Sequence, residues 1–251
     1  MKERTPAKRY IYKSNELILR SKYDFSLQEQ KVLNFVCSKI STPIYVGDVE
    51  VVNLPSRKNR TVEFEVKELC DSIGITYSGK NAVDIKDVLK NISDKSYWIK
   101  NKDDDSYHII RWFEDIIYRP IIDGTRGNGH VKVIFHEEIA PHLFYLQRNY
   151  TKLDLGDEVS FVHRATPALY DILMSVKFKK QPEYETDFEN LLVQLDFDDI
   201  VMLKQYKYFN SKVLKPSIKE INENTRLNVT YSSKRTEGKT TIKFLVEEKV
   251  I

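Results

Sequence analysis

The stretch that most constrains this chain covers Leu203–Arg226 and is followed by two alternating, β-branched segments. Plotted as a helix at about 100° per residue, it gathers apolar side chains on one side and lysines on the other. The cationic side covers an arc of roughly 140° and also holds Tyr208 and Ser211. Its lysines are Lys204, Lys207, Lys212, Lys215 and Lys219. Pro216 predicts a kink near Lys212, because proline lacks a backbone donor and crowds the preceding turn.

The segments after this helix predict a β-hairpin. Residues 226–231 and 240–246 alternate around a polar, glycine-containing turn at 232–239, which is the pattern of two paired strands. The turn is basic and carries Lys234, Arg235 and Lys239. A lysine-faced helix followed by a basic hairpin has the outline of a winged helix, in which the helix enters the DNA major groove and the hairpin touches the backbone beside it. For the helix alone, the alternative is a solvated surface helix rich in lysine.

Composition sets further bounds. The chain has 251 residues with 40 Lys and Arg against 37 Asp and Glu, a net charge of +3, so a nucleic-acid site must come from local clustering of charge. Cys37 and Cys70 lie in apolar stretches without metal-ligand spacing and predict buried thiols in a reducing cytoplasm. No apolar run approaches the ~18 residues of a membrane span, and the polar N-terminus does not resemble a signal peptide. We therefore expect a cytoplasmic protein with no membrane partner.

The first half of the chain predicts a similar order of elements. Residues 1–13 are polar and basic and indicate a flexible arm. The predicted elements after the arm are a helix opened by the capping box Ser26–Glu29, a strand at 61–66, helices at 67–73 (closed by Gly74) and 82–92, and hairpins at 96–118 and 117–135. The candidate DNA contacts of this half are Ser78, Lys80, Asn81 and Lys86. A glycine-rich turn at 123–129 lacks the strand-to-helix context of a nucleotide loop, so it is assigned to a hairpin.

The second half repeats this order. An apolar helix at 161–178 and a short helix at 188–195 precede the lysine-faced helix and its hairpin. Such a repeat predicts two similarly built domains on one chain. We therefore predict an α+β fold of two tandem winged-helix domains related by a pseudo-repeat. The predicted boundaries are a flexible basic arm at 1–13, one domain at 14–148 and the other at 149–251.

Four segments carry a resemblance to a known family. They are Asn15-Glu16-Leu17-Ile18 with Phe25 to Leu33, then Leu169 to Leu173, and above all the segment from Phe209 to Asn222, FNSKVLKPSIKEIN. In order and spacing, over roughly residues 14 to 248, the chain resembles the plasmid replication initiators that bind DNA iterons through two winged-helix domains. Many members have two or three basic residues before the Val-Leu pair, where this chain has Asn210-Ser211-Lys212. Base reading is therefore expected to lean on Asn, which suits adenine, and Ser, which can bond several bases.

The resemblance implies sequence-specific binding to direct repeats at a replication origin, local opening of the origin, and recruitment of host replication proteins such as a helicase and an initiator. It also implies dimers that repress their own promoter and monomers that initiate. The alternative is a transcriptional repressor that binds a palindromic operator and does not initiate; a structural or interaction protein is a third class. Direct repeats beside A·T-rich DNA would favour initiation, whereas a lone inverted repeat would favour repression.

The sequence shows no catalytic constellation. Rolling-circle initiators need two His one residue apart and a Tyr nucleophile, but the five His, at positions 108, 130, 136, 142 and 163, contain no such pair. His136-Glu137-Glu138 begins like a zinc-protease motif, yet Ala140 stands where the second His is required. The acidic run at 103–105 is interpreted as a solvated turn. We therefore expect a DNA-binding protein that is not an enzyme and needs no metal or cofactor.

Overall fold

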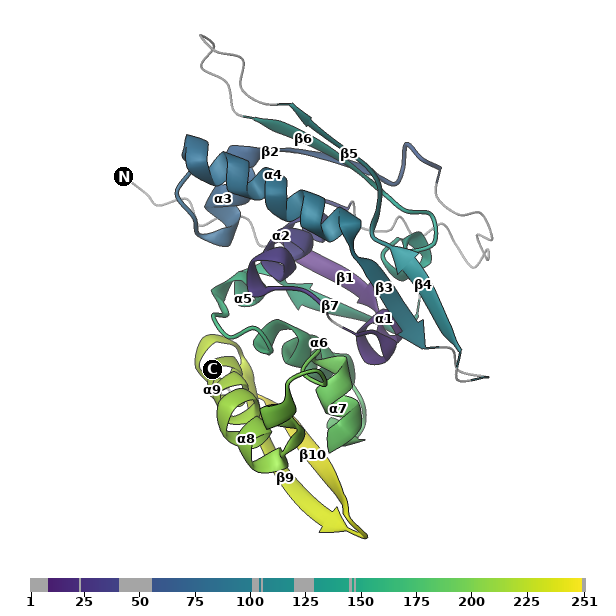
Figure 1. The fold of residues 1–251 in the computed structure, drawn as a ribbon, viewed down its shortest axis with the longest axis vertical. Helices are drawn as coiled ribbons and strands as arrows, with labels where there is room; N and C mark the ends of the chain where they lie inside the picture. Colours follow the sequence, from purple (N-terminus) through teal and green to yellow (C-terminus); the bar gives the residue numbers. More distant parts are fainter. Residues whose placement is uncertain are drawn as a thin grey trace.

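The computed structural model describes residues 9–22, 24–40, 56–100, 104, 106–119, 129–144, 146 and 148–249. The first eight residues of the predicted arm and most of the glycine-rich turn at 123–129 lie outside these ranges. Figure 1 shows two halves, one above the other, with the C-terminal hairpin extending from the lower half.

The first half contains the predicted helices and hairpins. Its helices are α1 (Asn15–Arg20), α2 (Leu27–Ser38), α3 (Val66–Ile73) and α4 (Gly79–Asp94), and its strands are β1 (Tyr10–Ser14), β2 (Thr61–Glu65), β3 (Ser96–Lys100), β4 (Tyr107–Arg111), β5 (Phe113–Arg119) and β6 (His130–Phe135). The capping box is confirmed: Ser26 Oγ accepts from Glu29 N at 3.3 Å and Glu29 Oε2 accepts from Ser26 N at 2.6 Å. Gly74, at φ 76°, closes α3 as predicted.

The second half begins after a 3₁₀ turn at Ala140–His142. Its strands are β7 (Tyr150–Asp154), β8 (Glu183–Asp187), β9 (Leu227–Thr236) and β10 (Lys239–Glu248), and its helices are α5 (Leu155–Ser160), α6 (Thr166–Val176), α7 (Phe188–Gln194), α8 (Tyr206–Phe209) and α9 (Lys215–Asn224). The helix predicted at 161–178 is thus shorter. Phe161 is extended and fully buried, and its ring lies 5.3 Å from that of Tyr170, so the apolar run includes a turn that is packed in the core.

The two halves share one sheet topology. In the first half β6 lies between β2 and β5, and in the second half β10 lies between β8 and β9, with antiparallel pairing throughout. In each half, the strand that precedes the short helix therefore pairs with the last strand of the hairpin. The first half adds the separate hairpin β3–β4 after α4. This shared topology confirms the predicted α+β pseudo-repeat.

The last residues of the arm predicted at 1–13 form a strand instead. Tyr10–Ser14 form β1, which pairs antiparallel with β7. The side chains of Ile11 and Lys13 are buried, and this alternation explains why the segment is a strand rather than a loose arm. The pairing also joins residues from both sides of the predicted boundary at 148/149 in one sheet; the boundary itself stays a prediction.

The strand predicted at 107–118 is divided at Trp112. Residues before it pair with β3, and residues after it pair with β6. Trp112 is 2% exposed and lies edge-on against Phe25, with 6.3 Å between the rings. The chain therefore leaves one hairpin and enters another around a side chain that is fixed in the core.

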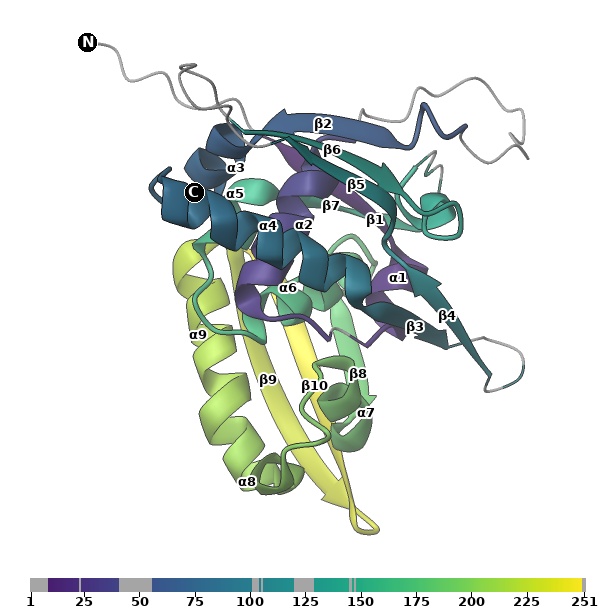
Figure 2. The ribbon, with the colours of Figure 1, turned by 45° about the horizontal axis from the view of Figure 1, so that its top comes forward.

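Helix α6 lies where the halves meet, packing against α1 and β7 on one side and against α9, β8 and β10 on the other (Figures 1 and 2). Buried polar groups reinforce this position. Lys13 Nζ donates to Asp171 Oδ2 on α6 at 2.7 Å. Asn34 Nδ2 donates to Glu158 Oε2 on α5 at 2.9 Å. The two halves are thus joined through their cores.

Both cysteines are free and buried, as predicted. Burial, the dominant cause, raises the pKa of Cys37 to about 12. Along the described ranges, the helices are too short or too polar to cross a membrane.

Candidate nucleic-acid interface

The lysine-faced segment is a composite helix. It consists of α8, a π turn at Asn210–Leu214, and α9, and the extended residue Gln205 separates it from a preceding 3₁₀ turn at Val201–Lys204. In the π turn, the Lys215 N–H donates to the Asn210 carbonyl, five residues back. Pro216 lies in the first turn of α9, and in a regular helix its ring would meet the carbonyl four residues earlier. The wider turn relieves that contact, so the irregularity predicted near Lys212 is a π turn.

The composite helix separates an apolar side from a cationic side. Phe209, Leu214 and Ile221 are fully buried. All five predicted lysines are exposed. Glu220 is turned inward and is only 6% exposed. Its carboxylate accepts from Val162 N at 2.5 Å, His163 N at 3.2 Å and Thr166 Oγ1 at 2.5 Å. The acid nearest to the lysines in sequence is therefore removed from their face.

The five lysines are not equivalent. Lys219 lies 3.7 Å from the carboxylate of Glu223. Among the described residues, Lys204, Lys207, Lys212 and Lys215 form no ion pair. Lys204 ends the 3₁₀ turn and is not part of a regular helix, which corrects the predicted arc. Lys207, Lys212 and Lys215 therefore present unneutralised charge on a helix surface, as phosphate binding requires.

Three side chains predicted to act between the lysines have different surroundings. Tyr208 is 38% exposed, and Ser211 is exposed with its hydroxyl donating to the Tyr208 carbonyl at 3.2 Å. Asn210 is half-buried, and the Tyr231 hydroxyl of β9 donates to Asn210 Oδ1 at 2.6 Å. An Asn that reads adenine uses both ends of its amide. Asn210 already has its carbonyl end occupied, so its amino group is the end available to a base.

The hairpin β9–β10 forms the wing. Its turn has only two central residues, Glu237 at φ 50° and Gly238 at φ 83°, which matches a tight turn that needs positive φ at both positions. The turn predicted at 232–239 is therefore shorter, because the strands extend further. Lys234, Arg235 and Lys239 lie on the strand ends beside this turn, all exposed. In Figure 2 the wing extends past α8, so its cationic end lies beyond the start of the composite helix.

Helix α4 is the first-half counterpart of the composite helix, but its surface differs. Ser78 Oγ accepts from Asn81 N at 3.2 Å, and the Asn81 side chain donates to the Thr76 carbonyl. These two predicted DNA contacts therefore already cap the start of the helix. The exposed charged residues in its first turns are Lys80, Asp84, Lys86 and Asp87. Because acids alternate with the two predicted lysines, this face is far less positive than that of the second half.

Two residues that shape the interface were not predicted to do so. Tyr231 holds Asn210, and Glu220 anchors α9 to the residues that precede α6. Their partners lie 21 and 54 to 58 residues away along the chain. Periodicity within one helix therefore could not identify them.

The surface formed by the composite helix and the wing presents amines, a guanidinium, hydroxyls and an amide. These groups suit phosphate oxygens and the edges of bases. In the part of the chain that the structure describes, no three His, Cys, Asp or Glu side chains gather in a way that could hold a metal ion. Fold and surface together define the class: a DNA-binding protein built from two tandem winged-helix domains.

The chain belongs to the family of replication initiator proteins. Residues 10–174 match the family model described as "Initiator Replication protein, WH1". Residues 187–246 match the model described as "Initiator Rep protein, WH2". The family resemblance inferred from the sequence is thereby confirmed. The first match runs past the predicted boundary at 148/149 and includes most of α6.

Solved structures show a similar fold. The chain is similar to the Pi initiator protein in complex with iteron DNA, with a TM-score of 0.69 and 18% identity, covering 96% of this chain and 99% of that chain. Two structures of domains 2 and 3 of RctB also match. One has a TM-score of 0.49 and 11% identity over 96% and 92% of the two chains, and the other 0.45 and 10% over 97% and 94%. No curated protein sequence matches the chain.

Proposed function

We propose that this chain is a sequence-specific, double-stranded DNA-binding initiator of plasmid replication, which binds direct repeats at its origin and helps to open it. The observation that carries the proposal is the exposed surface of the composite helix, where Lys207, Lys212 and Lys215 form no ion pair with any described acid, together with the wing. Family membership supports the initiator role. The fold shared with Pi, whose structure contains iteron DNA, supports repeated origin DNA as the ligand.

The proposal extends to four further properties. The chain recruits the host helicase and initiator, self-associates as a dimer, represses its own promoter in that form, and works in the cytoplasm. It acts by binding rather than by catalysis. Family membership is the support for these properties.

A footprint on the origin of the replicon that encodes the chain tests the proposal. Hydroxyl-radical cleavage should reveal protected direct repeats beside an A·T-rich segment. Each repeat should contain two protected tracts about one helical turn apart, because two domains would contact successive grooves. Protection of a lone inverted repeat would identify a repressor instead, and no protection even at low salt would overturn DNA binding itself.

A further inference from the structure

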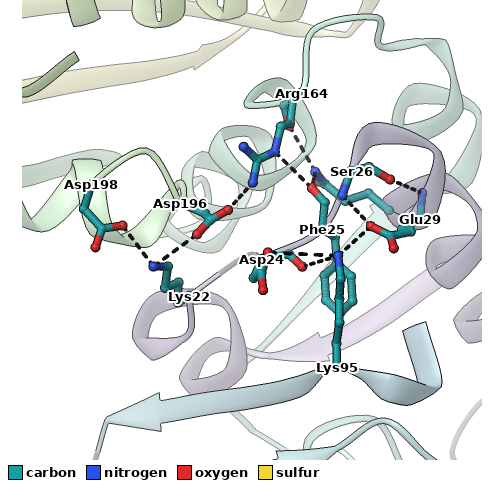
Figure 3. A network of polar contacts seen from close by, with 10 residues as sticks. Lys22, Asp24, Phe25, Ser26, Glu29, Lys95, Arg164, Asp196 and Asp198 are labelled. Atoms are coloured by element: carbon teal, nitrogen blue, oxygen red, sulfur yellow. Dashed lines mark hydrogen bonds and ion pairs between the residues drawn. The ribbon is translucent and has the colours of Figure 1, made fainter. Parts of the chain in front are cut away.

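A charged network lies where the two halves meet, around the loop between α1 and α2 (Figure 3). Lys22 Nζ lies 3.1 Å from Asp196 Oδ1 and 3.0 Å from Asp198 Oδ1. Arg164 also binds Asp196, and its Nε donates to the Phe25 carbonyl at 3.2 Å. The two aspartates follow α7 and precede the composite helix. This end of the network therefore holds the segment that leads into the DNA-facing helix of the second half.

The other end of the network holds α4. Lys95, directly after that helix, donates to Glu29 Oε2 at 2.8 Å and to the Asp24 carbonyl at 3.0 Å. Burial alone would raise the pKa of Glu29, but the hydrogen bonds from Lys95 and Ser26 lower it below its usual value. Asp24 and Glu29 thus bind the end of α4, whereas Lys22 binds the segment before α8, as Figure 3 shows.

The backbone at Asp196 indicates that this arrangement is specific. Asp196 has φ 59°, in the left-handed region that favours glycine. Glycine would adopt this conformation at lower cost, but only an acid can bind Lys22 and Arg164 together. The Asp196 side chain is only 14% exposed, so its interactions are partly shielded from solvent. Gln30 adds a buried bridge, because its amide donates to the Phe25 and Arg164 carbonyls at 3.1 Å each.

We propose that this network fixes the spacing between α4 and the composite helix on DNA, and that Lys22 and Asp196 are positioning residues for two-groove binding. We name it the inter-domain joint and define it as Lys22, Phe25, Glu29, Lys95, Arg164, Asp196 and Asp198. The inference rests on the proposed function. Two binding modules held at the distance of their two sites bind at high effective concentration, and a loose connection lowers that concentration.

The DNA test compares Lys22→Met with Lys67→Met. Lys67 pairs with Asp71 on α3, outside the joint, and is the matched control. Binding is measured to a full repeat, to repeats with one to three base pairs inserted between the two protected tracts, and to the half contacted by the second domain. Lys22→Met should bind the full repeat about tenfold more weakly, bind the half repeat normally, and lose the sharp dependence on spacing. Lys22→Arg keeps a cation at this position and should retain the sharp dependence on spacing.

A distance measurement tests the joint without DNA. Because Cys37 and Cys70 are buried, spin labels can be directed to Lys86→Cys on α4 and Lys207→Cys on α8, both exposed positions. The distribution of distances between the labels should broaden in Lys22→Met and stay narrow in Lys67→Met. Urea midpoints of both variants establish that each is folded.

The outcomes separate the two proposals. An unchanged spacing profile and an unchanged distance distribution in Lys22→Met would overturn the joint and leave the proposed function standing. Failure of the wild-type chain to bind any repeat would overturn the proposed function. In that case the distance distribution alone tests the joint: broadening in Lys22→Met would support it, and an unchanged distribution would overturn it.

Discussion

Among single residues, the surroundings of each lysine on the composite helix decide what it can contribute. Lys219 already shares its charge with Glu223, so its removal would also release an acid beside the phosphates. Lys207 and Lys212 have no such partner within the described ranges. They are therefore the cleanest probes of the interface, because their loss removes one charge and uncovers no other.

Lys207→Ala and Lys212→Ala should each weaken binding to the repeat and reduce the slope of log affinity against log salt by about one. Each lysine that neutralises a phosphate releases counterions on binding, so its loss removes that release. Anisotropy titrations over a range of salt concentrations measure both quantities, and Lys67→Ala should change neither. If both variants keep the wild-type slope and affinity, the composite helix does not contact DNA.

In the core, the residue to test is Glu158. Burial, and then the charge of Asp171, raise the pKa of this fully buried carboxyl well above its usual value. Above about pH 4.3 the unfolded chain releases a proton that the folded chain keeps. Stability from this group is therefore lost as pH rises from that value toward the folded-state pKa.

Glu158→Gln should remove this pH dependence, because glutamine stays neutral and still offers an oxygen to Asn34. The free energy of unfolding of the variant, minus that of the wild type, should increase with pH above about 4.3, by at most about 1.4 kcal/mol per pH unit. Urea unfolding at several pH values between about 5 and 8 measures this difference. Glu247→Gln, at an exposed strand position, is the control. A difference that stays constant with pH would contradict the assignment.

Among the elements, the features set by neighbouring residues were predictable and those set by distant partners were not. The capping box at Ser26 and the helix end at Gly74 depend on residues a few positions away, and both were correct. The break at Trp112 and the pairing of β1 with β7 depend on the assembled core. The lysine face followed from helical periodicity, whereas the Tyr231 bond to Asn210 required the strand register of the wing.

The placement of α9 provides a test at this scale. Glu220→Ala should lower the free energy of unfolding by about 3 kcal/mol, because it removes a carboxylate that accepts from the Val162 and His163 N–H groups and from the buried Thr166 hydroxyl. Glu220→Gln keeps an acceptor oxygen and should lose less. The exposed Glu223→Ala is the control. Urea unfolding measures these free energies. If Glu220→Ala lost no more than about 0.5 kcal/mol, which is typical of a surface change, Glu220 would not anchor α9.

For the whole molecule, the repeat of sheet order suggests two separable reading domains, yet the contacts indicate one unit. α6 packs against elements of both halves. The β1 residue Lys13 reaches across to Asp171 on α6, and Gln194 on α7 donates to the Leu19 carbonyl. Shared burial of this kind makes the stability of each half depend on the other. We therefore expect the described core to unfold in one cooperative transition.

The positions of the two tryptophans make that expectation measurable. Trp98 and Trp112 both lie in the first half, so their fluorescence reports that half, while far-UV circular dichroism reports the whole chain. The two urea midpoints should coincide. Lys13→Met should lower both midpoints together, with a loss of about 3 kcal/mol or more in free energy of unfolding, because it removes the ammonium that pairs with the Asp171 carboxylate, which is 1% exposed. Midpoints that separate, or a variant that moves only the fluorescence, would show that the halves unfold independently.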